Sequence, residues 1–418
     1  MSKKELIPIL RFSEFRDEMS WTVGTLGRPD LSCFIKQRVR LEELNIESYV
    51  STENLLPNYA GVSRSSKLPP SGSFTHYKRD DILISNIRPY LKKVWSADRE
   101  GAASNDVIVI RSGKSLSPKY LLYIVKNDYF INYVMNGTKG VKMPRGDLDS
   151  IKKYLVPYPG DLEQQKIADC LSSIDELITA QNQKLEALNA HKKGLMQKLF
   201  PAQGETMPKL RFGGFVGEWR GYSFGKILKV VSGKGFKAAE YSKYGVRLLQ
   251  IENVGYGITK WNENTIFLPE TYCTEYSDLA LKSGDVVLAL NRPVTNGELK
   301  IAKLSRDDEP SILYQRVGKV ELLDENMNFD FIFHFCRNFI KGFVDTQSIG
   351  SDQPFISLRD LYSQDVLLPD PEEQQKIAEC LSSIDELIKA QIKKIDSLSV
   401  HKKGLMQQLF PAVEEGFA

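Results

Sequence analysis

Two stretches of nearly identical sequence decide how this chain is organised. Residues 163–201 read EQQKIADCLSSIDELITAQNQKLEALNAHKKGLMQKLFP, and residues 373–411 read EQQKIAECLSSIDELIKAQIKKIDSLSVHKKGLMQQLFP. The two stretches are identical at 29 of 39 positions, with a constant offset of 210 residues. Self-similarity of this degree indicates an internal duplication.

The regions that precede the two copies are related much more weakly. PILRFSEF from Pro8 parallels PKLRFGGF from Pro208, and DDILISNIRP from Asp80 parallels GDVVLALNRP from Gly284. This contrast indicates that the two copies share one role and that the regions before them have two different targets. The alternative is that the sequences of exposed domain surfaces simply change faster. We predict a globular domain over 1–160, a helix over 161–201, a second globular domain over 202–370, a helix over 371–411 and a tail over 412–418.

Each copy carries the local signals of one long helix. Asp161 and Asp370 are the predicted N-caps, with Gln164 and Glu373 in the reach-back position of a capping box, and a proline ends each copy. Apolar residues recur at alternating steps of three and four, which is the heptad pattern of a helix that packs on another helix. The predicted seam consists of Ile167, Leu171, Ile174, Ile178, Leu185, Leu188, Leu195 and Leu199, and of Ile377, Leu381, Ile384, Ile388, Ile395, Leu398, Leu405 and Leu409.

Polar residues interrupt the seam at matching places in both copies. They are Gln181 and Gln391, followed by Lys192 and Lys402. A polar seam residue lowers stability but fixes register and orientation. Because an apolar seam needs a partner, we expect the two copies to pair with each other in antiparallel orientation; pairing between two chains is the alternative.

The end of each copy contains a histidine and a glycine. His191 and His401 are expected to complement the dipole at the helix C-terminus rather than to act in catalysis. Gly194 and Gly404 are costly inside a helix, and the close approach of another helix would explain them.

The two domains have the pattern of mixed α and β structure. The aromatic-rich runs Lys119–Val134 and Phe329–Val344 predict helices whose rings belong to the core rather than to a base-stacking surface. The fold class is therefore α+β, with two mixed domains in tandem, each followed by a long helix, and with the two helices forming an antiparallel coiled coil of pseudo-two-fold symmetry. The predicted strands are Asp81–Ile87, Val107–Ile110, Val246–Ile251, Asp285–Leu290 and Val317–Leu322.

Composition favours a globular protein of two or three domains. The chain has 418 residues, of which 42% are hydrophobic and 26% are charged. It contains no apolar run of the ~18 residues that a membrane helix needs, and its N-terminus lacks a signal-peptide pattern, so we expect a cytoplasmic protein. The five cysteines form no CxxC pair. Cys170 and Cys380 are expected to be buried small apolar residues rather than redox groups.

Charge is spread unevenly along the chain. Residues 1–160 contain 25 Lys and Arg against 17 Asp and Glu, whereas residues 202–370 contain 20 against 22. The first domain therefore suits a polyanionic partner, and the second has only a local basic strip between Lys226 and Arg247.

Basic and amide side chains gather in predicted loops of both domains. Two of these loops, GTKGVK at 137–142 and SIGSDQ at 348–353, occupy corresponding places. Lys and Arg bind phosphates, and Arg, Asn and Gln can read base edges; solvated charged loops are the alternative. The predicted DNA-binding residues are Arg38, Arg40, Lys67, Arg88, Lys92, Lys93, Lys139, Lys142, Arg145, Lys234, Lys237, Arg247, Asn291, Arg292 and Gln353.

Sequence motifs of catalysis are missing. The chain has no glycine-rich phosphate loop, no HExxH and no GxSxG, and its four histidines lack a metal-ligand spacing. The segment Asn291–Val294 departs from the Asn-Pro-Pro-aromatic motif of amino-methyltransferases because Arg292 stands at its second position. We therefore predict no catalytic residue, no metal site and no cofactor bound by this chain.

This arrangement resembles the specificity (S) subunits of type I restriction–modification enzymes. The resemblance rests on two diverged domains, each followed by a helix that begins EQQKIAxCLSSIDELI and ends HKKGLMQxLFP. Further matches are SYVSTENLLPN at 48–58 and LRFGGFVGEWRGYSFGKI at 210–227. The first domain departs from the pattern, because the segment after Phe15 lacks the Ser-Gly-Lys stretch found at Ser232–Lys234.

The resemblance implies a non-catalytic subunit with two target recognition domains, each reading one half of a split site in double-stranded DNA. It implies helices that act as spacer and docking surface. Its partners would be two modification subunits, which methylate adenine with S-adenosylmethionine, and restriction subunits, which translocate and cut DNA with ATP and Mg²⁺. A protein–protein adaptor, an enzyme that acts on DNA alone and a subunit of a methylation-only system are the alternatives.

Overall fold

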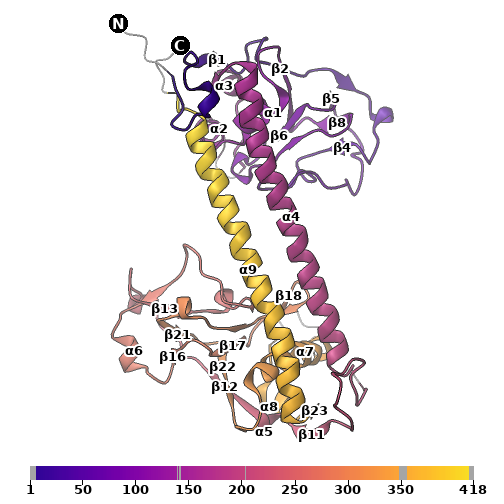
Figure 1. Ribbon diagram of the computed structural model, residues 1–418, viewed down its shortest axis with the longest axis vertical. Coiled ribbons are helices and arrows are strands. Elements are labelled where there is room, and N and C mark those ends of the chain that lie inside the picture. Colours follow the sequence, from indigo (N-terminus) through magenta and orange to yellow (C-terminus); the bar gives the residue numbers. More distant parts are fainter. Residues whose placement is uncertain (1–5, 139, 141–142, 203, 348–354, 414–418) are drawn as a thin grey trace. The chain divides into compact units, whose positions relative to one another are not determined.

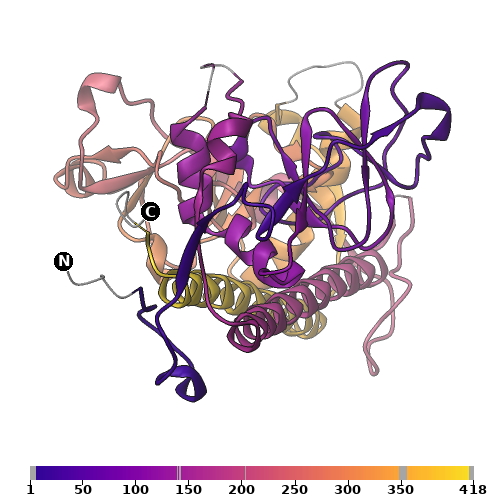
Figure 2. The ribbon, with the colours of Figure 1, turned by 90° about the horizontal axis from the view of Figure 1, so that it is seen from above.

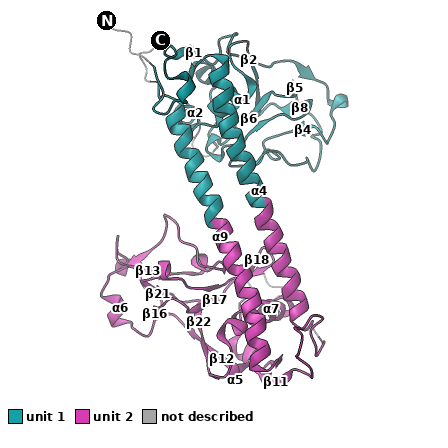
Figure 3. Cartoon of the chain, viewed as in Figure 1, with its two compact units in different colours: residues 1–182, 393–418 teal, residues 183–392 magenta. Residues whose placement is uncertain are grey.

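The computed structural model describes residues 6–138, 140, 143–202, 204–347 and 355–413. The chain forms two compact units (Figure 3). Unit 1 contains residues 1–182 and 393–418, and unit 2 contains residues 183–392. Each unit therefore combines one mixed domain with parts of both long helices.

The duplicated stretches form the two long helices, α4 (Asp161–Leu199) and α9 (Pro371–Leu409), of 39 residues each. In both units the two helices lie side by side (Figures 1 and 2). They run antiparallel, because Asp175 contacts Lys402 in unit 1 and Lys192 contacts Asp385 in unit 2. The predicted antiparallel pairing of the copies is confirmed. All residues of the predicted seam are buried or half-buried.

The domain of unit 1 contains two four-stranded sheets and one strand pair. The sheets have the orders β2-β9-β6-β7 and β3-β5-β8-β4, and β1 pairs antiparallel with β10. The elements are β1 (Thr22–Thr25), β2 (Ser32–Phe34), β3 (Arg38–Val39), β4 (Tyr49–Val50), β5 (Phe74–Tyr77), β6 (Ile82–Ser85), β7 (Val94–Ser96), β8 (Gly101–Ser104), β9 (Val107–Ser112), α1 (Pro118–Lys126), α2 (Asp128–Asn136), α3 (Leu148–Lys152) and β10 (Leu155–Tyr158).

The domain of unit 2 contains a five-stranded sheet, β12-β22-β17-β20-β14, and a four-stranded sheet, β15-β13-β21-β16. Two strand pairs, β11-β23 and β18-β19, complete it. The elements are β11 (Arg220–Ser223), α5 (Phe224–Ile227), β12 (Leu228–Ser232), β13 (Val246–Leu249), β14 (Tyr256–Gly257), β15 (Phe267–Leu268), α6 (Tyr272–Glu275), β16 (Ala280–Leu281), β17 (Val286–Ala289), β18 (Val294–Thr295), β19 (Glu298–Leu299), β20 (Ile301–Lys303), β21 (Ser311–Leu313), β22 (Val317–Leu322), α7 (Phe329–Gln347), α8 (Leu358–Tyr362) and β23 (Asp365–Leu368).

The ends of the long helices complete the hydrophobic core of each domain. In unit 1 the start of α4 and the end of α9 pack among the domain's apolar residues, and in unit 2 the end of α4 and the start of α9 do the same. The helix ends are therefore part of the domains. The helix-terminal residues in the two cores are Ile167, Ala168, Leu171, Met406, Leu409 and Phe410 in unit 1, and Leu199, Phe200, Ile377, Ala378 and Leu381 in unit 2.

A buried ion pair holds the start of each domain against a long helix. Arg11 binds both carboxylate oxygens of Glu163 at 2.8 Å, and these side chains are 6% and 1% exposed. Arg211 binds Glu373 in the same way at 2.8 and 2.6 Å. The arginine of each LRF motif therefore docks its domain on the helix, and the predicted reach-back role of Glu373 is wrong.

The glutamine after each of these glutamates also binds the domain. α4 begins at Asp161, and Gln164 accepts a hydrogen bond from the backbone N of Ser117, the N-cap of α1, at 3.0 Å instead of reaching back. Gln374 accepts the equivalent bond from Asn328, which caps α7, at 3.0 Å. The predicted capping box of the first helix is therefore wrong, because tertiary contacts occupy the glutamine.

The five predicted strands are confirmed by β6, β9, β13, β17 and β22. The predicted helix Phe329–Val344 is confirmed by α7. The other predicted helix, Lys119–Val134, is divided into α1 and α2 at Asn127. The Asn127 side chain accepts a hydrogen bond from the backbone N of Tyr129 and donates one to the carbonyl of Met406. This residue ends α1, caps α2 and joins both to α9.

Two expectations about small residues are wrong. Apart from the adjacent residues and backbone of its own helix, a Cβ atom at Gly194 or at Gly404 would meet no atom within 4 Å among the described residues, so no neighbouring helix approaches these glycines within that part of the chain. Cys170 and Cys380 are half-buried rather than fully buried. Burial raises the pKa of both thiols.

In the described ranges, no group of three or more His, Cys, Asp or Glu side chains could hold a metal ion. In the same part of the chain, no helix is both long enough and apolar enough to cross a membrane.

Candidate nucleic-acid interface

A turn with an unusual backbone follows the same central strand in both domains. β6 and β17 are buried along their whole length, and each leads into an arginine followed by a buried proline. The φ angles of Arg88 and Arg292 are 51° and 45°. A residue before proline is normally extended, and a non-glycine residue rarely adopts the left-handed conformation. Both arginines are exposed, so the two turns project the same cation from corresponding places.

In unit 1, the segment before α3 holds this turn. The backbone N of Arg88 donates to the carbonyl of Pro144 at 2.8 Å, and Ile87 forms a β-bridge with Arg145. The Arg145 guanidinium lies 3.1 Å from the Asp106 carboxylate and stays exposed. Two predicted DNA-binding residues, Arg88 and Arg145, are thereby brought together.

In unit 2, the segment before α8 holds the turn in the same way. Asn291 forms a β-bridge with Phe355, and the backbone N of Ile356 donates to the carbonyl of Leu290 at 2.9 Å. Asn291 and Arg292 therefore lie at the counterpart of the Arg88 turn. Lys139, Lys142 and Gln353, also predicted to bind DNA, lie outside the described residues.

Several other predicted DNA-binding residues make contacts within the chain. Lys92 and Lys93 bind the Asp128 carboxylate and the Thr52 carbonyl at 2.5 Å each. Arg38 donates to Asn105 at 2.7 Å, and Arg247 stacks on Trp261 at 4.8 Å. Lys234 lies 4.2 Å from the ring centroid of Tyr276. Arg40, Lys67 and Lys237 are exposed. Lys92 ends the short helical turn that begins at Arg88, so of these residues it lies in the same turn as Arg88.

Sequence reasoning missed Phe355, whose side chain is 67% exposed. Its position corresponds to Arg145 at the offset of 210 residues that relates the two long helices. Extending that offset upstream of the helix would have drawn attention to it.

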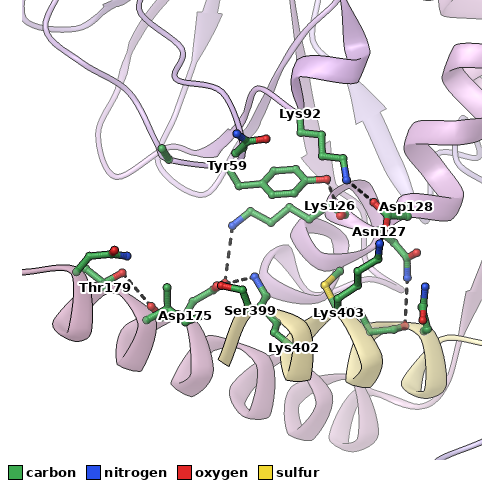
Figure 4. Close-up of a pocket in the computed structure, with 16 residues that line it drawn as sticks. Tyr59, Lys92, Lys126, Asn127, Asp128, Asp175, Thr179, Ser399, Lys402 and Lys403 are labelled. Atoms are coloured by element: carbon green, nitrogen blue, oxygen red, sulfur yellow. Dashed lines mark hydrogen bonds and ion pairs between the residues drawn. The ribbon is translucent and has the colours of Figure 1, made fainter. Parts of the chain in front are cut away.

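A second duplicated feature joins each domain to the middle of the helix pair. In unit 1, a cleft of about 530 Å³ contains the Asp175 carboxylate (Figure 4). Asp175 accepts a hydrogen bond from the Tyr123 hydroxyl at 2.9 Å and pairs with Lys402, and Lys126 lies 3.9 Å away. Burial lowers the pKa of Lys126 and raises that of Tyr123. We call Asp175 with these three partners the unit 1 polar node.

The unit 2 polar node has the same arrangement, with His334 and Arg337 in place of Tyr123 and Lys126. Asp385 pairs with Lys192, and its carboxylate lies 3.6 Å from Arg337 and 3.9 Å from His334. Burial, followed by the Arg337 cation, lowers the pKa of Lys192 to about 8. Burial, followed by the cations Lys192, Arg337 and Lys303, lowers the pKa of His334 well below its usual value. The lysines that interrupt the predicted seam thus pair with the opposite helix in both units.

Comparison with known proteins places the chain in a family. The model described as the type I restriction modification DNA specificity domain matches residues 41–190 and 217–397. The chain therefore belongs to the type I restriction–modification specificity subunits.

Individual relatives agree with this placement. The chain is 36% identical to the type I restriction enzyme MjaVIII specificity subunit of Methanocaldococcus jannaschii, over 80% of this chain and 84% of that protein. It is 28% identical to the EcoAI specificity subunit of Escherichia coli over 41% of this chain and 28% of that protein. The solved S subunit from M. genitalium has a TM-score of 0.59 at 16% identity, covering 98% of this chain and all of that one, which supports the fold.

Proposed function

We propose that this chain is the DNA-reading subunit of a type I restriction–modification complex and that each unit reads one half of a split site. The observation that carries the proposal is the duplicated turn. Two diverged domains keep an exposed left-handed arginine at the same place, although this backbone is costly for a non-glycine residue. Different side chains around a shared support would read different bases in the two half-sites.

The partners follow from the same proposal. Two modification subunits would methylate adenine with S-adenosylmethionine, and restriction subunits would cut DNA with ATP and Mg²⁺, all docked on this chain. The chain itself would bind none of these cofactors and would not be catalytic. A methylation-only system would use the chain in the same way without restriction subunits.

The first experiment is to co-express the chain with its modification subunits and to map adenine methylation across a genome by single-molecule sequencing. We expect a motif of two short blocks separated by a fixed gap. Arg88→Ala should weaken methylation of sites whose block read by unit 1 departs from the motif. Arg292→Ala should do the same for sites whose block read by unit 2 departs from it. A stable complex that methylates without any motif would overturn the DNA-reading proposal.

Two assays distinguish the alternative functions. Purified chain incubated with DNA, S-adenosylmethionine and ATP should show no turnover, and turnover would indicate an enzyme that acts alone. Duplex binding should weaken steeply with salt, because phosphate contacts release counterions. Binding that is absent at low salt would favour a protein–protein adaptor.

A further inference from the structure

Phe355 is an exposed aromatic side chain in a supported position. It is 67% exposed, although burial of a phenylalanine ring would stabilise the fold. The next residue, Ile356, is 5% exposed and packs in the core of unit 2. Because consecutive side chains of an extended segment point to opposite sides, the buried Ile356 anchors the segment while Phe355 faces outward.

The backbone around Phe355 is held on both sides. Its β-bridge with Asn291 and the bond from Ile356 to Leu290 join it to the turn that carries Arg292. The turn itself follows the buried strand β17 and ends in a buried proline. The backbone of Phe355 is therefore fixed against the turn that carries Arg292, which lowers the entropic cost of a contact by the exposed ring.

The corresponding position of unit 1 carries a cation. Arg145 forms the same bridge with the turn of Arg88, and its neighbours Pro144 and Gly146 are buried. The support is thus the same in both units, whereas the exposed side chain is a guanidinium in one and a phenyl ring in the other. Two half-sites of different sequence require a difference of this kind.

We infer that Phe355 determines specificity in the half-site read by unit 2, through apolar contact of its ring with the bases. Arg292, which follows the bridge partner Asn291, contributes the positive charge that binds a phosphate, and Arg145 makes the corresponding polar contact in unit 1. A phenylalanine can contact the thymine methyl group or wedge between base steps. This inference rests on the proposed function.

The test uses the full chain in complex with its modification subunits. Methylation maps are compared for wild type, Phe355→Ala, Phe355→Leu and the control Val216→Ala, which removes another exposed apolar side chain of unit 2 that is 91% exposed. Phe355→Ala should relax one or two base positions in one block, with a loss of discrimination of roughly 10-fold or more. The other block and the map of the control should stay unchanged.

Two further variants test the inference in more detail. Arg145→Ala should relax the block read by unit 1, because Arg145 occupies the position that corresponds to Phe355. Phe355→Leu should keep part of the discrimination if the contact is to a methyl group, and should resemble Phe355→Ala if the ring separates base steps. A duplex with 2-aminopurine at the relaxed position should fluoresce more strongly with wild type than with Phe355→Ala in the second case only.

An unchanged motif for Phe355→Ala, with normal complex formation, would overturn the inference while leaving the proposed function intact. Absence of any motif for the wild-type complex would instead overturn the proposed function. Relaxation of both blocks by Phe355→Ala would also count against the inference, because a general loss of affinity does not identify a base contact.

Discussion

Gly194 and Gly404 occupy equivalent places inside α4 and α9, with open space around them. Glycine is less favourable than alanine inside a helix by about 1 kcal/mol. We therefore expect Gly194→Ala and Gly404→Ala each to raise the free energy of unfolding by about 0.5 to 1 kcal/mol, measured by urea denaturation of the full chain.

The control for this prediction is Gly225→Ala. There a Cβ would lie 2.8 Å from the Cβ of Tyr362 and 3.1 Å from its carbonyl oxygen, so the substitution should destabilise. Lower stability of the two helix variants would contradict the open surroundings of Gly194 and Gly404.

We expect His334 to make unit 2 sensitive to acid. Its pKa is lowered in the folded chain, so below the usual pKa of about 6.5 the unfolded chain binds a proton that the folded chain does not. Stability is therefore lost as the pH falls below that value, at up to about 1.4 kcal/mol per pH unit. His334→Gln should reduce this loss, measured as the unfolding free energy at pH 7, 6 and 5.

The matched control is His401→Gln, which changes an exposed histidine of α9. It should follow the wild-type pH dependence. If His334→Gln follows it as well, protonation of His334 does not contribute to acid unfolding.

At the scale of helices and strands, the polar nodes define how the two long helices pair. Each node takes an aspartate from one helix and a lysine from the other, so both lysines have a carboxylate partner in the antiparallel register that the structure has. An apolar heptad seam alone tolerates slippage, whereas buried polar groups disfavour registers in which they are unpaired.

Asp385→Asn should destabilise the chain by about 2 to 3 kcal/mol, because Lys192 and Arg337 lose the carboxylate beside them. Lys192→Met in the same chain should recover a large part of this loss, since the buried cation is then also removed. A double-mutant cycle of unfolding free energies measures the coupling.

Glu386→Gln is the control, because Glu386 is the exposed neighbour of Asp385. It should change stability little. Additive effects of Asp385→Asn and Lys192→Met would indicate that the node does not couple the two helices.

At the scale of the whole molecule, the proposed function predicts that phosphate contacts, including those of the two turns, make DNA binding depend on salt. If 6 to 10 phosphates are contacted, affinity should fall by about 10³ to 10⁵ between 50 and 200 mM salt. Arg88→Ala and Arg292→Ala should each reduce the slope of log affinity against log salt by about one. Titration of a labelled duplex at several salt concentrations measures these slopes.

The control for the salt dependence is Lys193→Ala, which removes an exposed cation of α4 that belongs to neither turn. The slope of this variant should equal that of wild type. An equal slope for Arg88→Ala and wild type would remove Arg88 from the phosphate contacts.

Repetition and periodicity in the sequence determined the large-scale organisation. The alternation of domain and helix, the length of α4 and α9, the seam and the antiparallel pairing could all be predicted, because each depends on local propensity or on a pattern of apolar residues. The central strands β6 and β17 were predicted for the same reason. The equivalence of Arg88 and Arg292 also followed from the parallel between DDILISNIRP and GDVVLALNRP, whereas the left-handed backbone at both arginines did not.

Only the tertiary structure decided what those residues do. Gln164 and Glu373 stand at the sequence positions typical of a capping box. In the structure they accept hydrogen bonds from Ser117 and Arg211, which lie in distant segments of the chain. The exposure of Phe355 depends on Ile356 finding the core. Such contacts join segments tens to hundreds of residues apart, where neither propensity nor periodicity carries information, because they are set by which surfaces meet when the two units fold.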